Sequence, residues 1–170
     1  LSGLEVLLRS QGSKVKELIL EEVDILTVGL HPVMEELGRN TTVTHLALGT
    51  SEWSRGNVQQ LKAVLRQNTA LESLDLSLSC LRSAGLAEIA PVLYHNIAMK
   101  SLDLSANGLD DIESANALRE LIRRNKTITN LCIADNAFGG NVATVRSITD
   151  GVQSNTALHY LDLGLCGLDD

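Results

Sequence analysis

The chain has 170 residues, of which 44% are hydrophobic and 21% are charged, and its formal net charge is −7. This length suits one domain or a short repeat array, and the apolar content excludes a disordered chain. The acidic balance disfavours nucleic-acid binding, because phosphate contacts need cations. No apolar run approaches the ~18 residues that span a bilayer, so we expect no membrane association.

Leucine dominates the apolar residues: the chain has 31 leucines but four aromatic residues. Its three cysteines, Cys80, Cys132 and Cys166, are far apart and lack the spacing of a disulfide framework or a zinc site. We therefore expect a reducing, cytoplasmic environment and neither a metal nor a cofactor. Because the chain begins at Leu1 rather than Met, we also expect it to be a fragment of a longer protein.

Six copies of one apolar pattern follow one another along the chain. In each copy, apolar residues stand 3, 5 and 10 positions after a first apolar residue. The copies begin at Val15, Val43, Leu71, Met99, Ile128 and Leu158, at intervals of 28 to 30 residues. Because strand side chains alternate, positions 3 and 5 share one face. The pattern predicts short strands within residues 15–21, 43–49, 71–77, 99–105, 128–134 and 158–164.

Between these strands the apolar spacing changes to three and four, which is one face of an α-helix. The five stripes are Leu30, Val33, Leu37; Val58, Leu61, Leu65; Leu86, Ile89, Leu93; Ala115, Leu118, Ile122; and Val145, Ile148, Val152. Leu4, Leu7 and Leu8 predict a further helix ahead of the first strand. The expected fold class is an α/β solenoid of about six repeats over residues 1–170.

A glycine or an asparagine stands three residues before every copy. These residues are Gly12, Asn40, Asn68, Asn96, Asn125 and Asn155. Glycine and asparagine best tolerate the left-handed backbone that closes many helices. We therefore predict a left-handed helix cap at each of these positions.

The segments 71–77 (LESLDLS) and 99–109 (MKSLDLSANGL) resemble leucine-rich repeats. A strand and a full helix in about 28 residues is similar to the ribonuclease-inhibitor-like subclass. That resemblance implies a horseshoe with parallel strands on the concave face and helices on the convex face. The same subclass occurs in NOD-like receptors, in actin regulators such as tropomodulin and the CARMIL proteins, in RanGAP and in bacterial effectors.

The resemblance also implies a ladder residue at position 8 of each copy, usually Asn or Cys, which hydrogen-bonds backbone groups in the turn. Three copies match the family with Asn107, Asn136 and Cys166. Three copies depart from it with Val23, Ser51 and Ser79. We therefore expect a less regular turn edge in the N-terminal half.

Positions 2, 4 and 6 of each copy face the concave side, and none of these eighteen residues is Lys or Arg. This acidic surface predicts a protein partner with a basic patch, steered by complementary charge. The aspartates also match the common Leu-Asp-Leu strand consensus, so a purely structural role stays open. The candidate binding residues are Glu17, Glu21, His45, Ser73, Asp75, Ser101, Asp103, Asn130, Cys132, Tyr160 and Asp162.

Catalytic roles have little support from the sequence. Asp75 and Asp103 share a position on adjacent strands, about 4.8 Å apart. Such a pair suits acid–base work or cation binding, but we expect both carboxylates to be exposed and solvated. His45 and His159 are on the order of 19 Å apart, too far to share a metal. Cys132 lacks an adjacent base, so we expect no enzyme.

Aromatic residues divide between the core and the concave face. Trp53 and Phe138 occupy the inward position 10, which predicts that both are buried in the core. Tyr160 occupies a concave position and is the aromatic anchor candidate for a partner.

These observations favour a non-enzymatic protein-interaction module, either an innate-immune sensor or a cytoskeletal scaffold. The resemblance also admits a RanGAP-like regulator of a small GTPase, or the recognition arm of a bacterial effector or ubiquitin ligase. Neither end of the array has an evident polar cap, so we also expect self-association through the ends.

Overall fold

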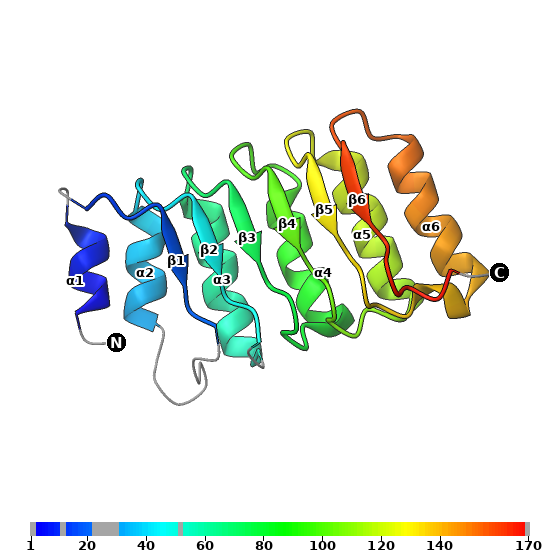
Figure 1. The fold of residues 1–170 in the computed structure, drawn as a ribbon, viewed down its shortest axis with the longest axis horizontal. Coiled ribbons are helices and arrows are strands. Elements are labelled where there is room, and N and C mark those ends of the chain that lie inside the picture. Colours follow the sequence, from blue (N-terminus) through cyan, green and yellow to red (C-terminus); the bar gives the residue numbers. More distant parts are fainter. Residues whose placement is uncertain (1–2, 11–12, 22–30, 51–52, 169–170) are drawn as a thin grey trace.

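The computed structural model describes residues 3–10, 13–21, 31–50 and 53–168. One layer of parallel strands packs on one layer of helices, and the repeats follow one another from end to end (Figure 1). The sheet has six strands in the order of the sequence: β1 (Glu17–Ile19), β2 (His45–Ala47), β3 (Ser73–Asp75), β4 (Ser101–Asp103), β5 (Asn130–Cys132) and β6 (Tyr160–Asp162).

The predicted strand register is confirmed. The central leucines of neighbouring strands pair with one another: Leu18, Leu46, Leu74, Leu102, Leu131 and Leu161. The first five are buried and Leu161 is half-buried, because β6 has no neighbour on its outer side among the described residues. Each repeat therefore contributes the same leucine to one continuous core.

The helices cover one face of the sheet. They are α1 (Leu4–Arg9), α2 (His31–Arg39), α3 (Arg55–Gln67), α4 (Arg82–Leu93), α5 (Ile112–Arg124) and α6 (Val142–Gln153), with a 3₁₀ turn η1 at Phe138–Gly140. The predicted stripes of α3, α4 and α5 are buried throughout. In α6, Ile148 is buried, but Val145 and Val152 are half-buried. None of the helices described is long and apolar enough to cross a membrane.

The prediction of left-handed helix caps is wrong at the five asparagines, none of which has a positive φ, and Gly12 lies outside the described residues. Asn68 and Asn125 do cap α3 and α5, but both have extended backbones with φ of −76° and −72°. Their side chains bond backbone groups instead. Asn125 Nδ2 donates to Leu93 O in the preceding repeat at 2.7 Å, and its Oδ1 accepts the Ile128 N–H at 2.7 Å. An amide that joins two repeats is the better reason for asparagine here.

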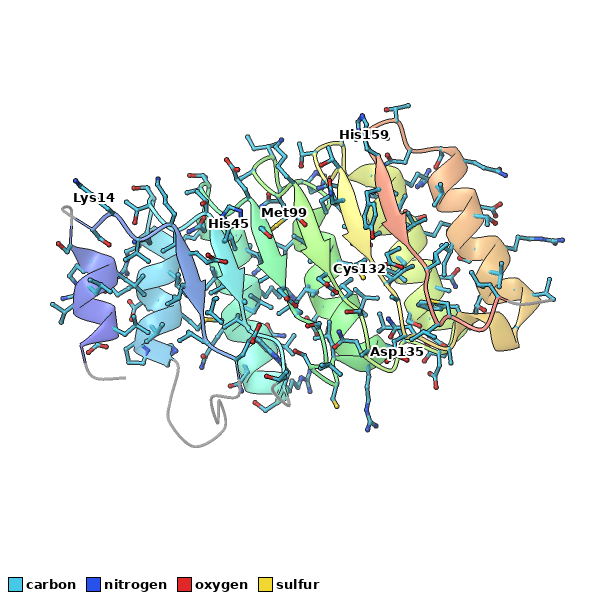
Figure 2. The ribbon with its side chains drawn as sticks, viewed as in Figure 1. Lys14, His45, Met99, Cys132, Asp135 and His159 are labelled. Carbon is cyan, nitrogen blue, oxygen red and sulfur yellow. The ribbon has the colours of Figure 1, made fainter. Side chains whose placement is uncertain are left out.

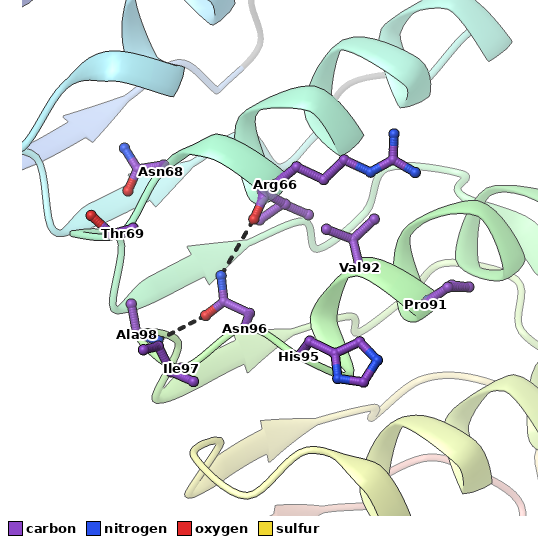
Figure 3. Close-up of a pocket in the computed structure, with 10 residues that line it drawn as sticks. Arg66, Asn68, Thr69, Pro91, Val92, His95, Asn96, Ile97 and Ala98 are labelled. Carbon is purple, nitrogen blue, oxygen red and sulfur yellow. Dashed lines mark hydrogen bonds between the residues drawn. The ribbon is translucent and has the colours of Figure 1, made fainter.

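The same arrangement recurs in an asparagine ladder, which consists of Asn40, Asn68, Asn96, Asn125 and Asn155. Asn96 is its weakest member: Nδ2 lies 3.5 Å from Leu65 O, whereas Asn68 Nδ2 lies 2.6 Å from Leu37 O. A cavity of about 350 Å³ opens beside Asn96, between the C-terminal ends of α3 and α4 (Figure 3). Pro91 lies in the last turn of α4, where its ring disfavours regular helix.

A second set of side chains joins the repeats just after the strands end, whereas the asparagine ladder lies just before the strands begin. The resemblance implies this second set. Asn107 Nδ2 donates to Leu76 O at 2.8 Å, Asn136 Nδ2 to Leu104 O at 3.0 Å, and Cys166 Sγ to Ile133 O at 3.2 Å. Ser79, expected to depart from the pattern, is fully buried and takes the equivalent place: its hydroxyl lies 3.4 Å from Leu48 O of the preceding repeat and 3.1 Å from Ser77 O, within hydrogen-bond distance of both. Val23 and Ser51 lie outside the described residues.

Left-handed backbone recurs at the strand exits rather than at the C-terminal helix ends, and Arg82, the first residue of α4, also has a φ of 53°. Position 7 of five copies has a φ between 52° and 59°, at Thr50, Leu78, Ala106, Asp135 and Leu165. This conformation is costly for residues with a Cβ. The stacked repeats stabilise it, since Leu78 N donates to Ser105 O at 3.0 Å and Asp135 N to Gly164 O at 2.8 Å.

Candidate protein-interaction surface

The outward side chains of the strands form two parallel rows on the concave face. The strand-start row consists of Glu17, His45, Ser73, Ser101, Asn130 and Tyr160. The strand-end row consists of Ile19, Ala47, Asp75, Asp103, Cys132 and Asp162. Figure 2 views this face, with His45 and Cys132 labelled on their strands. The structure thus places on one surface ten of the eleven predicted site residues, and Glu21 follows β1.

The exposure of these residues varies along the array. Glu17, Glu21, His45, Asn130 and Tyr160 are exposed. Ser73, Asp75, Ser101, Asp103, Cys132 and Asp162 are half-buried. The centre of the surface is therefore smooth and lined by short side chains, while longer side chains stand near the two ends. Tyr160, with 53% of its surface exposed, remains available as an anchor.

The three aspartates of the strand-end row are not simply solvated, which for Asp75 and Asp103 is contrary to expectation. Asp75 Oδ1 accepts the Ser77 N–H at 2.8 Å, and Asp103 Oδ1 accepts the Ser105 N–H at the same distance. Asp162 Oδ1 accepts the Gly164 N–H at 2.9 Å. These are Asx turns, in which a side chain stabilises the backbone two residues later. One oxygen of each aspartate thus has a structural role, as the consensus interpretation allowed.

The charge of the surface nevertheless remains negative. The eighteen concave positions include five acidic residues and no Lys or Arg. Asp162 raises the pKa of the neighbouring Tyr160 phenol, chiefly through its charge. Asp135, exposed at the strand exit after β5, extends the acidic surface. The convex side differs, since Arg123 and Arg124 of α5 pair there with Glu120 at 3.0 and 2.8 Å.

Nothing in the described surface forms a catalytic arrangement. Burial raises the pKa of the Cys132 thiol, and Asp103 and Asp162 add to this effect, so the thiolate is disfavoured. His45 Nδ1 contacts Thr44 Oγ1 at 2.8 Å, and His159 Nδ1 contacts Ala157 O at 2.6 Å. Among the described residues, no group of three or more His, Cys, Asp or Glu side chains is arranged to hold a metal.

Two apolar features near the surface add to the candidate set. Ile19 in the strand-end row is largely exposed, and the sequence argument named no role for it. The sequence signal that could have identified Ile19 as a contact residue is an apolar side chain at a strand position predicted to face outward. Leu78 and Leu165, at the left-handed strand exits, are also exposed and line the rim where the strands end. A partner on the acidic surface would meet these leucines along one edge.

Trp53 does not lie fully in the core as predicted. Phe138 is completely buried, but Trp53 is half-buried and lines a cavity of about 550 Å³ between α3 and α4. The Nε1 atom of Trp53 is buried without a hydrogen-bond partner. An indole is too large to fill the slot that leucine occupies in neighbouring repeats, such as Leu81 and Leu109, which are buried.

Comparison with known proteins supports the fold. Neither a family model nor a curated protein matches the chain. A solved structure described as Leiomodin-1 Actin-Binding Site 2 (ABS2) matches with a TM-score of 0.69 and 20% identity over 76% of each chain. The tropomodulin C-terminal domain of Caenorhabditis elegans matches with a TM-score of 0.73 and 12% identity, over 91% of this chain and 92% of that one. The chain thus has the leucine-rich-repeat fold that the sequence predicts.

Proposed function

We propose that this leucine-rich-repeat solenoid is a non-catalytic protein-binding module whose concave face receives a partner with a basic patch. The observation that carries the proposal is the strand-end row, where Asp75, Asp103 and Asp162 lie on an extended surface without a cation. Each carboxylate has one oxygen in an Asx turn. The charge itself is not neutralised by these backbone contacts, so it remains available to attract lysines and arginines.

The surface suits a partner that approaches along the array. Acidic side chains spaced at one per strand attract a basic patch over several strand widths and raise the association rate. Tyr160 and the rim residues Leu78 and Leu165 would add the apolar contacts that charge alone does not supply.

Actin is the first partner to test. A leiomodin structure of the same fold is described as an actin-binding site. The three free cysteines fit a cytoplasmic protein, where actin is found. Neither structural match is described as an innate-immune receptor, so we favour the cytoskeletal interpretation. No residue of the described surface favours the RanGAP-like or the effector alternative.

The test is binding of purified actin, as filaments by co-sedimentation and as monomers by fluorescence anisotropy. The variant Asp75→Asn, Asp103→Asn, Asp162→Asn removes three charges but keeps an oxygen to accept each Asx hydrogen bond. We expect this variant to bind actin on the order of tenfold more weakly than the parent chain. The difference in affinity between the two should be smaller at high salt, because salt screens the charges.

A matched control removes three charges elsewhere, by Asp110→Asn, Glu113→Gln and Asp150→Asn, all at exposed positions outside the strands. This control should bind like the parent chain. If the concave variant and the control bind actin equally well, the acidic surface is not the binding site. If the parent chain does not bind actin but captures a different protein with a basic patch, and the concave variant loses that protein while the control keeps it, actin is the wrong partner and the surface assignment stands.

A further inference from the structure

A second site is separate from the concave face and lies between the N-terminal ends of α3 and α4. It is a cavity of about 550 Å³, within the range of small-molecule sites. Its lining includes Trp53, Arg55, Val58, Cys80, Arg82 and Ala84. We propose that this cavity binds a small organic anion, specifically a carboxylate carried on an apolar body.

The apolar part of the ligand would rest on Trp53 and on the aliphatic side chains of Val58 and Ala84. Gly85 lets α4 pack closely against the Leu81 side chain in this wall, because a Cβ at that position would lie 2.5 Å from it. The Trp53 Nε1 atom is buried beside the cavity without a partner.

The charge of the lining specifies an anion. Arg55 and Arg82 are exposed residues that begin α3 and α4 respectively. Glu88 is the acid in the described lining, and Lys62 Nζ binds its carboxylate at 2.5 Å. In the described lining, the two guanidinium groups therefore outnumber the one carboxylate, on a chain whose net charge is −7.

The N-terminal end of α3 reinforces this preference. Neither α3 nor α4 has an acidic residue in its first turn, and α4 has no side-chain cap at its N-terminus. By contrast, α5 has Glu113 in its first turn and Asp111 as its cap. The partial positive charge of the α3 end is thus left for an external anion, whereas at the α4 end the Asp111 carboxylate already accepts a hydrogen bond from Ser83.

Trp53 makes the proposal testable, because it is the one tryptophan of the chain and its emission reports on the cavity. The probes are octanoate, its neutral analogue octanamide and the cation octylammonium, each titrated into the whole chain below micelle-forming concentrations. We expect octanoate to shift the emission saturably and the two analogues to bind at least tenfold more weakly.

The variant Arg55→Gln, Arg82→Gln should weaken octanoate binding at least tenfold and change both exposed positions without opening the core. Arg66→Gln is the matched control, since Arg66 is exposed on the same helix about 16 Å along its axis from Arg55. Octanoate should also slow the alkylation of exposed Cys80 by iodoacetamide.

Each of the following results would overturn the proposal. The first is an absence of saturable change with octanoate. The second is equal binding of octanoate and octanamide. The third is unchanged octanoate binding in the double arginine variant or a Cys80 alkylation rate that octanoate does not alter. None of these results bears on actin binding, so the two proposals stand or fall separately.

Discussion

Short polar side chains connect the repeats of this molecule at the scale of single residues. The amides of the asparagine ladder join neighbouring repeats just before the strands begin. Asn107, Asn136 and Cys166 join them just after the strands end. Aspartate carboxylates stabilise the turns that leave the strands. Each of these groups pairs with backbone that would otherwise be buried without a partner, which is the costly case for polar groups.

Asn125 should therefore contribute more to stability than Asn96. Asn125 donates to Leu93 O at 2.7 Å and to Asn96 O at 3.2 Å, whereas Asn96 donates to Leu65 O at 3.5 Å. We expect Asn125→Ala to lower the free energy of unfolding by about 3 kcal/mol, and Asn96→Ala by about half as much. Urea denaturation followed by circular dichroism measures both.

The exposed Asn130 is the control for these two variants, and Asn130→Ala should change stability by less than about 0.5 kcal/mol. Equal losses at Asn125 and Asn96 would contradict the view that the weak hydrogen bond marks a weak junction.

The repeated element is one strand and one helix that bury a shared leucine core. The leucines of β2 to β5 are buried between neighbouring strands on both sides, whereas Leu161 of β6 has a neighbouring strand on one side and is half-buried. An element in the middle of the array thus gains more from each apolar residue than an element at its end, because its neighbours exclude water from both sides.

Leucine truncation should show this difference directly. Leu102 is buried in β4, so Leu102→Ala should cost about 2–5 kcal/mol. Leu161 occupies the same position in β6 but is half-buried, so Leu161→Ala should cost less than half as much. Thermal and urea unfolding of the two variants provide the comparison, and equal costs would argue against a core that thins toward this end.

Glu120 is one carboxylate that contributes to the pH dependence of α5. Hydrogen bonds from Arg124 and then Arg123 lower the pKa of Glu120 below its ordinary value of 4.5. The ionised form is therefore favoured in the folded state. Its contribution to stability is complete above about pH 4.5 and is lost as the pH falls through the lower folded pKa. Below pH 4.5, Glu120→Gln should give a shallower decline of stability than the parent chain.

Urea unfolding between pH 3 and pH 7 measures this decline. Glu113→Gln, at the opposite end of α5, is the matched control and should leave the acid decline as it is in the parent chain. A decline of the same steepness in the parent chain and in Glu120→Gln would exclude the Arg124 pair as its source.

The described solenoid exposes apolar side chains at both of its end surfaces. Val6 and Leu7 of α1 are exposed at one end, and Leu168 is exposed at the other. Each repeat in the interior covers its neighbour, whereas these end surfaces lack such cover among the described residues. We therefore expect the isolated chain to associate through its ends as its concentration rises.

Sedimentation-velocity runs over a concentration series test this association. The variant Val6→Glu, Leu7→Glu should shift the chain toward the monomer, because charge in an apolar contact is costly. Ile97→Glu is the control, since Ile97 is 78% exposed on a turn in the middle of the array. Association that persists in the first variant would assign the contact to another surface.

The sequence by itself determined the repeat, the helix and strand faces and the acidic concave rows. Those features follow from local periodicity: alternation of two in the strands and spacings of three and four in the helices. The three-dimensional structure decided the rest. The backbone of Asn125, the Asx turn of Asp103 and the half-burial of Trp53 all differ from their sequence-based predictions.

The reason is that these features depend on groups that meet after the repeats stack. The acceptor of Asn125, Leu93 O, lies 32 residues earlier in the chain, and the cavity beside Trp53 is formed jointly by α3 and α4. Local pattern identifies which residues face inward, but not which backbone group or gap each will meet. Local periodicity therefore specified the solenoid, and the residues at the outward strand positions specified the charge of its concave face. The stacking of the repeats determined which acidic side chains also support the backbone and where a cavity opens.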